Sequence, residues 1–294
     1  MKRSDRLAVV KGLVKLARPR DWIKNVFVVA PVPFAVAAGS RFEFSPFVWG
    51  LAGFCLMNSA VYTFNDLLDA AADRLHPQKR QRPLAAGTVS PAAAMVQIAV
   101  FLLAGLGLCL ASGEPGALAI SLVYVCVNVV YSAWAKRVAL LDVFLLSSGF
   151  VIRVLLGCIL VAAPPSTWLL LCTSAIALFL GFAKRRADLL AGVDHNHRPS
   201  LRGYSQSFLD QAMAICAGAA ILAYALYSIE SKILVKGREM AAMPFVAYGI
   251  LNYLRLADTE DAGGSPVEIA YTSRSSQICA LGWVVAVTWS LGLW

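Results

Sequence analysis

The chain has 294 residues, of which 59% are hydrophobic and 15% are charged, and its mean hydropathy is +0.68. Soluble domains carry about 25% charged residues, so these values exclude a water-soluble globular protein. Lys and Arg number 26 against 17 Asp and Glu, which gives a net charge of +9. In a soluble protein this excess would suggest nucleic-acid binding, but no folded basic surface supports it here. We therefore expect a membrane protein without a nucleic-acid partner.

Apolar segments follow one another along almost the whole chain. A bilayer core of about 30 Å needs about 20 apolar residues per helix. The sequence therefore predicts an all-α fold, a polytopic membrane bundle of about nine transmembrane helices, with approximate spans Ile23–Gly39, Phe47–Leu68, Ala92–Ser112, Gly116–Trp134, Ala139–Ala162, Thr167–Ala183, Leu209–Ser228, Ala241–Leu256 and Gln277–Trp294. Pro31 and Pro33 should kink the first span. No polar stretch is long enough for a soluble domain, so we expect residues 1–294 to form a single integral membrane domain.

Basic residues are distributed unevenly between the two ends of these spans. With the basic amino-terminal segment 1–22 in the cytoplasm, 21 Lys and Arg fall on the cytoplasmic side and 4 on the opposite side. Cytoplasmic loops of membrane proteins carry such an excess of positive charge. We therefore expect an integral protein of the inner (cytoplasmic) membrane, with cytoplasmic active-site loops at 69–91 and 184–208.

An acidic cluster stands at the cytoplasmic end of the second span, formed by Asn65, Asp66, Asp69 and Asp73. These residues are three or four positions apart, so the side chains project from one side of a helix. Carboxylates near a membrane are costly unless a cation neutralises them, and magnesium binds carboxylate oxygens while sharing its coordination with phosphates. The cluster therefore predicts a magnesium site and a diphosphate-bearing substrate. The alternative is an acidic helix end that only pairs with the basic residues that follow it.

A basic cluster follows the sixth span, where Asp188 stands among Lys184, Arg185, Arg186, Arg198 and Arg202. Arg binds phosphate through bidentate hydrogen bonds and Lys binds it as a point charge. We expect phosphate binding here by Lys184, Arg185, Arg186 and Arg202. A positive-inside loop without a substrate is the alternative, and it accounts for part of the cluster.

One arginine, Arg153, lies inside the fifth span, and Asp142 stands eleven residues before it. Eleven residues are about three helical turns, so Asp142 is expected on the same face beneath Arg153. An ionisable group inside a membrane is a functional candidate by default. A structural ion pair is the alternative.

The stretch from Asn65 to Gly87, NDLLDAAADRLHPQKRQRPLAAG, resembles the first aspartate-rich motif of the UbiA-type intramembrane prenyltransferase superfamily. The resemblance implies nine helices and a magnesium diphosphate held by Asn65, Asp66, Asp69 and Asp73, with Lys79 and Arg82 on phosphate oxygens. Ordinary members carry a second aspartate-rich motif after the sixth helix, where this chain has its basic cluster. The runs RPRDWIKN (18–25), YSAWAK (131–136), KRRADL (184–189) and GGSPVE (263–268) are similar to the decaprenyl-phosphate phosphoribosyltransferase branch.

This second resemblance implies magnesium-dependent phosphoribosyl transfer from 5-phosphoribosyl diphosphate to a polyprenyl, decaprenyl-like monophosphate, for cell-envelope pentose precursors. It implies that Asp66, Asp69, Asp73 and Lys79 act on the departing diphosphate. Lys24, Lys136 and Arg153 are candidates for another phosphate, and Asp142 for a ribose hydroxyl or for orienting Arg153. An oligomer is compatible with this interpretation.

Two other interpretations stay open from the sequence. A UbiA-type prenyltransferase would move a prenyl group from a prenyl diphosphate to an aromatic or other small acceptor, and it would need the second aspartate-rich motif. A non-enzymatic membrane transporter would need internal repeats with interrupted helices at matching positions, and the sequence shows no such pairing.

Overall fold

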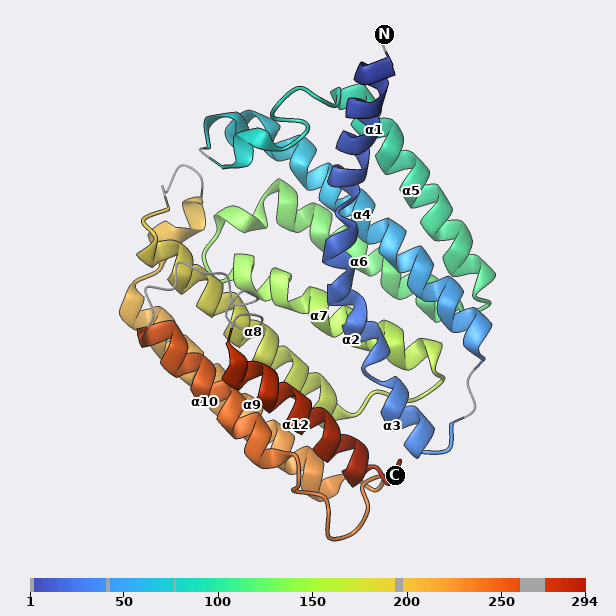
Figure 1. Ribbon diagram of the computed structural model, residues 1–294, viewed down its shortest axis with the longest axis vertical. Helices are drawn as coiled ribbons and strands as arrows, with labels where there is room; N and C mark the ends of the chain where they lie inside the picture. The colour runs from blue at the N-terminus through green and yellow to red at the C-terminus, as the bar shows by residue number, and fades with distance from the viewer. Residues whose placement is uncertain (1–2, 41–42, 77, 194–197, 260–272) are drawn as a thin grey trace.

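All the regular elements of the described residues are helical, which confirms the predicted all-α fold (Figure 1). The computed structural model describes residues 3–40, 43–76, 78–193, 198–259 and 273–294. In chain order the elements are α1 (Arg3–Ala17), η1 (Pro19–Asn25), α2 (Val26–Val29), α3 (Val32–Ala37), α4 (Phe44–Leu75), η2 (Lys79–Gln81), α5 (Pro91–Ala111), α6 (Pro115–Ala133), η3 (Ala135–Arg137), α7 (Leu141–Leu160), α8 (Thr167–Leu190), η4 (Pro199–Gly203), α9 (Gln206–Glu230), α10 (Met243–Thr259) and α12 (Arg274–Ser290).

The predicted count of about nine membrane spans is not confirmed. Within the described ranges, 6 helices, α4 to α9, are long and apolar enough to cross a membrane. Helices α10 and α12 have 17 residues each, about 26 Å at 1.5 Å per residue, which is shorter than the bilayer core. The first predicted span is divided among η1, α2 and α3, and the break between α2 and α3 falls at Pro31, because proline disrupts a continuous helix.

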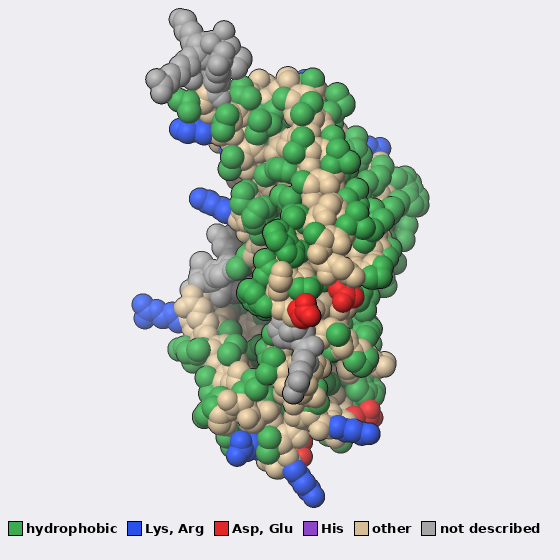
Figure 2. Space-filling model, turned by 90° about the vertical axis from the view of Figure 1, so that its right-hand side faces the viewer, with side chains coloured by type: hydrophobic (Ala, Val, Ile, Leu, Met, Phe, Trp, Pro, Cys, Tyr) green, Lys and Arg blue, Asp and Glu red, His purple; other side chains and the backbone are tan. Residues whose placement is uncertain are grey.

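The outer surface of the long helices is strongly apolar. Large side chains on α5 and α9, among them Leu103, Leu110 and Ile215, are more than 60% exposed. Figure 2 shows a face on which hydrophobic side chains predominate and charged side chains are few. Since water would not tolerate so much exposed apolar surface on a monomeric soluble domain, this surface is the lipid-facing side of an integral membrane protein.

Helices α4 and α5 approach each other closely at a pair of glycines. A Cβ atom added to Gly53 would lie 2.7 Å from the carbonyl oxygen of Gly105. A Cβ added to Gly105 would lie 2.9 Å from the carbonyl oxygen of Gly53. Small residues allow membrane helices to pack backbone against backbone, so this pair fixes α4, the helix that carries the aspartates, against its neighbour.

The amino-terminal elements run across the bundle from α1 to α3 and pass over α7 (Figure 1). A Cβ on Gly157 of α7 would lie 2.2 Å from the carbonyl oxygen of Val28, so no side chain larger than hydrogen fits at this crossing. The crossing places η1, with Lys24 and Asn25, against the interior of the bundle.

Two helices extend beyond their predicted spans into segments that we expected to be loops. Helix α4 continues to Leu75, so its three aspartates lie on one uninterrupted helix. Helix α8 continues to Leu190, so residues 184–186 lie on a helix and not in a loop. The loops that contain the predicted site residues are therefore shorter than the segments 69–91 and 184–208.

Candidate active site

Two of the aspartates on α4 share one arginine. The Nη1 atom of Arg82 donates to Asp66 Oδ1 at 3.0 Å and to Asp73 Oδ2 at 2.8 Å. Asp66 is only 3% exposed and also accepts from Nη2 of Arg18 at 2.6 Å. The predicted common orientation of Asp66 and Asp73 is therefore observed, and two arginines compensate their charges.

The third aspartate, Asp69, pairs with a lysine from η3. Lys136 Nζ donates to Asp69 Oδ1 at 2.5 Å and to Asn65 Oδ1 at 3.4 Å. The side-chain nitrogen of Asn65 donates to Asp69 Oδ2 at 3.2 Å. Lys136, which the sequence suggested for a separate phosphate, thus lies on the aspartate cluster, defined here as Asn65, Asp66, Asp69 and Asp73.

Lys79, on η2, is the predicted diphosphate ligand next to this cluster. Its ammonium group makes no ion pair or hydrogen bond with any residue that the structure describes. Burial, together with the positive charge of Arg82, lowers the pKa of Lys79, while Asp73 and Asp69 act in the opposite direction. Lys79 is therefore a cation in a partly desolvated position that is free to bind an incoming anion.

The aspartate cluster has the right donor atoms for magnesium, since carboxylate and amide oxygens are the hard ligands that this ion prefers. Among the described residues, however, no group of three acidic, His or Cys side chains is arranged around a common metal position. Arg18, Arg82 and Lys136 bind the same carboxylate oxygens. A metal ion would have to compete with these three cations for its ligands.

Asp142 is completely buried at the start of α7, and Arg185 is its ion-pair partner. Arg185 Nε donates to Asp142 Oδ2 at 2.5 Å. The hydroxyl groups of Ser200 and Tyr204 donate to the same carboxylate at 2.9 and 2.7 Å. Asp142 does not pair with Arg153, because the extension of α8 brings Arg185 against the first turn of α7. With three donors and no exposed surface, Asp142 is not available for a ribose hydroxyl.

Leu140, two residues before Asp142, has its backbone in the left-handed region. Leu140 has φ 67° and donates its backbone N–H to the Tyr204 hydroxyl at 2.7 Å. Burial and the hydrogen bond to Asp142 raise the pKa of Tyr204, so this hydroxyl keeps its proton and serves as a donor. The Tyr204 hydroxyl thus joins the start of α9 to the start of α7.

Arg186 is also held by protein groups. Its Nε donates to Asp210 Oδ1 at 2.5 Å, its Nη1 to the carbonyl oxygen of Ala257 at 2.8 Å, and its Nη2 to Asp258 Oδ1 at 3.1 Å. Arg185 and Arg186 are therefore buried structural cations, contrary to their predicted role as phosphate ligands. Lys184 and Arg202 of the same cluster are exposed and have no ion-pair partner among the described residues.

Arg153 is buried in the interior of the bundle among neutral groups. It donates to Asn25 Oδ1 at 2.9 Å, to the carbonyl oxygen of Gly149 at 2.8 Å and to the Tyr124 hydroxyl at 3.2 Å. Three aromatic rings surround its guanidinium at 5.0 to 5.7 Å, those of Tyr124, Phe54 and Phe150. Cation–π interactions of this kind stabilise a desolvated cation, and no described carboxylate pairs with Arg153.

Lys24 lies on the inner side of η1. Its Nζ donates to Asp21 Oδ1 at 2.6 Å and approaches the Tyr62 hydroxyl at 3.4 Å. Arg18 and Lys24 both lie over the Tyr62 ring, at 5.2 and 5.5 Å from its centroid. The sequence prediction omitted Arg18 as a site residue, although the Arg-Pro-x-x-Trp run that begins there marked the segment.

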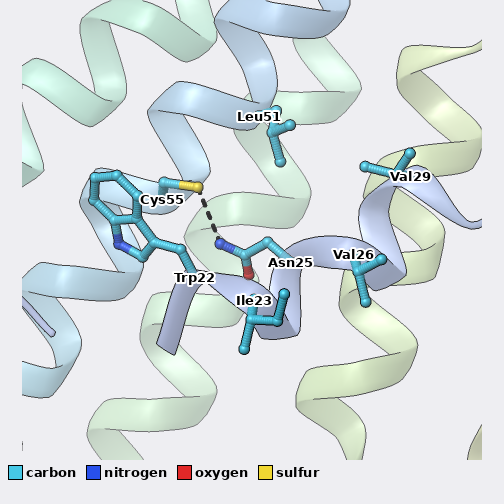
Figure 3. A pocket seen from close by; sticks show the side chains of 7 residues that line it. All are labelled: Trp22, Ile23, Asn25, Val26, Val29, Leu51 and Cys55. Carbon is cyan, nitrogen blue, oxygen red and sulfur yellow. Dashed lines mark hydrogen bonds between the residues drawn. The ribbon is translucent and has the colours of Figure 1, made fainter. Parts of the chain in front are cut away.

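A shallow apolar groove of about 200 Å³ lies along η1 (Figure 3). Its lining comes from η1, α2 and α4, and consists of Trp22, Ile23, Asn25, Val26, Val29, Leu51 and Cys55. Asn25 donates to Cys55 Sγ at 3.0 Å at the floor of this groove. The groove contains none of the predicted site residues, so it is separate from the aspartate cluster.

Some of the motifs lie outside the described residues. The histidines of the α8–α9 connection, His195 and His197, and the run GGSPVE at 263–268 belong to this part of the chain. Ser200 and Tyr204 are functional neighbours that sequence reasoning missed, and only Tyr204 carried a signal, because it closes the basic cluster.

Sequence relatives of this chain include two proteins named decaprenyl-phosphate phosphoribosyltransferase. The one from Corynebacterium glutamicum is 33% identical over 287 residues, which cover 94% of this chain and 85% of the relative. The one from Mycolicibacterium smegmatis is 34% identical over 300 residues, which cover 94% of this chain and 91% of the relative. Both matches therefore extend over nearly the whole of the two chains.

A solved structure has the same fold. The UbiA homolog from Archaeoglobus fulgidus bound to DMAPP and Mg2+ superimposes with a TM-score of 0.73, covering 96% of this chain and 99% of the other, at 18% identity. The sequence model of the UbiA prenyltransferase family matches residues 25–266, which contain the aspartate cluster, Lys136 and the basic run on α8. The chain therefore belongs to the UbiA prenyltransferase family.

Proposed function

We propose that this membrane transferase moves a phosphoribosyl group from 5-phosphoribosyl diphosphate to a polyprenyl monophosphate. The observation that carries the proposal is the state of the basic cluster on α8. Among the described residues of this segment the carboxylate is Asp188, which is engaged by Arg185 and Arg198, whereas Lys184 and Arg202 have no described partner. The position at which a prenyltransferase would need carboxylates for a second metal therefore offers cations for a phosphate.

The names of the two relatives favour the same substrates, since each is called a decaprenyl-phosphate phosphoribosyltransferase and each aligns with 94% of this chain. The solved Archaeoglobus homolog carries magnesium with a prenyl diphosphate, as its name states. The likeness in fold supports a magnesium ion and a diphosphate at the site of this chain. The names of the sequence relatives support the phosphoribosyl group and the polyprenyl phosphate as the groups that react.

The aspartate cluster would hold magnesium through the carboxylates of Asp66, Asp69 and Asp73 and the amide oxygen of Asn65. The metal, when bound, supplies positive charge that neutralises a departing diphosphate. Arg82 and Lys79 bind diphosphate oxygens from the η2 side. Lys136 pairs with Asp69 and compensates its negative charge.

The transfer forms one bond and breaks one. A phosphate oxygen of the lipid attacks the anomeric carbon of the ribose, and the bond from that carbon to the diphosphate oxygen breaks. Positive charge develops on the ribose while negative charge develops on the leaving group, and fixed cations stabilise the latter. A phosphate monoester is already ionised near neutral pH, so the chain needs no general base to activate it. We assign Lys184 and Arg202 to the 5-phosphate of the donor.

The remaining candidates receive other roles. Lys24 is the accessible cation on the inner side of η1, and we assign it to the lipid phosphate. Arg153 is enclosed on all sides and positions Asn25 without touching substrate. The active site faces the cytoplasm in this proposal, because the aspartate cluster stands at the end of its span that belongs to the predicted cytoplasmic side, the side with 21 of the basic residues.

Transfer by the purified protein tests the proposal directly. Proteoliposomes supplied with magnesium, polyprenyl monophosphate and donor labelled in the ribose should yield a labelled, acid-labile lipid and unlabelled diphosphate. The matched control replaces the acceptor by the corresponding polyprenol, which lacks the phosphate. If label reaches a lipid only when a labelled prenyl diphosphate and an aromatic acceptor are supplied, the chain is a prenyltransferase and the proposal is wrong.

The pKa of Lys79 gives the proposal a pH signature. Because burial and Arg82 lower this pKa, Lys79 loses its positive charge at a lower pH than an ordinary lysine, and the diphosphate loses a ligand. We expect kcat/KM to fall on the alkaline side in the wild type. Lys79→Arg should move this alkaline limb to higher pH, because arginine stays protonated. An alkaline limb at the same pH in both proteins would show that Lys79 does not control it.

A further inference from the structure

Helix α1 packs on the bundle by one face, at the level where the apolar spans end. Leu16 is fully buried in a small cluster with Leu84 and Val89 of the α4–α5 connection. Side chains near the ends of the α4 and α5 spans complete this cluster, among them Leu67, Ala70, Ala93 and Ala94. Helix α1 therefore lies beside the membrane–water interface and not among the six spanning helices.

The opposite side of α1 is exposed and amphipathic. Leu7, Val10 and Val14 are each 56% exposed, and their spacing of three and four places them in one stripe. Lys11 and Lys15 are exposed, and each stands one position after a member of the stripe, so they border it on one side. An apolar stripe bordered by lysines is typical of helices that lie in a bilayer interface, with lysine stems on the apolar surface and ammonium groups at the headgroups.

The two lysines are available for such headgroups. Lys11 has no ion pair or hydrogen bond with the described residues. Lys15 makes one long contact, 3.4 Å from its Nζ to the backbone carbonyl oxygen of Gln81. No carboxylate among the described residues neutralises either of them, so the charge beside the stripe is positive and its complement is an anion.

Helix α1 is joined to the aspartate cluster by one residue. Arg18 directly follows the helix and has φ 48°, in the left-handed region that side chains rarely adopt. Its Nη2 lies 2.6 Å from Asp66 Oδ1, and its guanidinium lies over the Tyr62 ring. The place of α1 on the bundle therefore sets the place of Arg18 at the site.

We propose that α1 is an interfacial helix that binds anionic phospholipid headgroups. The stripe of Leu7, Val10 and Val14 enters the bilayer, Lys11 and Lys15 contact the lipid phosphates, and this contact keeps Arg18 on Asp66. Transfer at the site consequently depends on the anionic lipid content of the membrane. This inference is independent of which substrates the site accepts, because it concerns α1 and its lipid surface.

The test uses the full-length protein in nanodiscs of phosphatidylcholine alone or mixed with phosphatidylglycerol. Hydrogen exchange of the α1 backbone amides is measured in wild type, in a Lys11→Gln/Lys15→Gln variant, and in a Lys232→Gln/Lys236→Gln control. A basic residue near an anionic surface contributes about 1 kcal/mol, which is about fivefold, so phosphatidylglycerol should slow exchange by about 25-fold in wild type. The control should respond like wild type, and the first variant should exchange equally in both lipids.

Two further variants examine the stripe and the connection to the site. Val10→Asp places a charge in the stripe, so α1 should exchange rapidly in both lipids. Arg18→Gln should retain the lipid-dependent protection of α1 while transfer no longer responds to phosphatidylglycerol. Equal protection of wild-type α1 in both lipids, or a lipid effect that survives in Lys11→Gln/Lys15→Gln, overturns the proposal. A slow-exchanging Val10→Asp variant overturns the placement of the stripe in the bilayer.

Discussion

Asp69→Asn should reduce phosphoribosyl transfer by on the order of 10³-fold, since Asp69 would hold the magnesium that stabilises the departing diphosphate, and loss of such electrostatic stabilisation has effects of this size. Asparagine keeps the shape of the side chain but not its charge, and it leaves Lys136, now 2.5 Å from Asp69, without a carboxylate. Because the Asp69 side chain is 29% exposed, the fold should tolerate the change.

Initial rates at saturating and at limiting magnesium measure this effect, and the deficit should be largest when the metal is limiting. Asp258→Asn is the matched control, because its carboxylate is 76% exposed and, among the described residues, pairs with Arg186 alone, and exposed pairs contribute little. An Asp69→Asn protein with the wild-type rate at limiting magnesium would contradict the metal assignment.

Asp142→Asn should destabilise the protein by about 3–5 kcal/mol, the usual cost of removing one partner of a buried ion pair. The carboxylate is fully buried and accepts from Arg185, Ser200 and Tyr204. Without its negative charge, the Arg185 guanidinium stays in a buried position with Asp188 as its one remaining carboxylate. The expected result is a lower unfolding temperature and rapid proteolysis of the segment from η4 to the start of α9.

Thermal unfolding followed by size-exclusion chromatography in detergent measures this loss. The double variant Asp142→Asn/Arg185→Met removes both charges and should recover part of the lost stability, because no uncompensated ion remains. If Asp142→Asn unfolds at the wild-type temperature, the Asp142 network is not what holds α7, α8 and α9 together.

Periodicity along the chain predicted the long helices well because burial in a bilayer requires continuous apolar segments. The spans that became α4 to α9 are each observed, and most of their ends are displaced by a few residues, whereas α4 and α8 extend to Leu75 and Leu190. The first predicted span is not one helix. Its apolar segment is long enough to cross a bilayer, but Pro31 prevents a continuous helix. The site residues on α4 were predictable from their spacing, since residues three and four apart share one face of a helix.

Partners from distant parts of the chain were not predictable. The spacing of Asp142 and Arg153 placed them on one face, but spacing along a helix does not say which neighbouring helix lies opposite. Asp142 meets Arg185, 43 residues later, and Arg186 meets Asp210 and Asp258. Two of the four residues assigned to phosphate, Arg185 and Arg186, therefore stabilise the fold instead.

The neutral surroundings of Arg153 have a consequence for how anions enter this protein. A positive charge enclosed by amide, hydroxyl and aromatic groups is not cancelled by a neighbour, and mobile salt ions do not reach it. Its field extends through the low-dielectric interior toward η1 and the aspartate cluster, where it adds to that of Lys24. The bundle thus carries a positive charge at its centre that would attract both phosphorylated substrates of the proposed reaction before either touches a side chain.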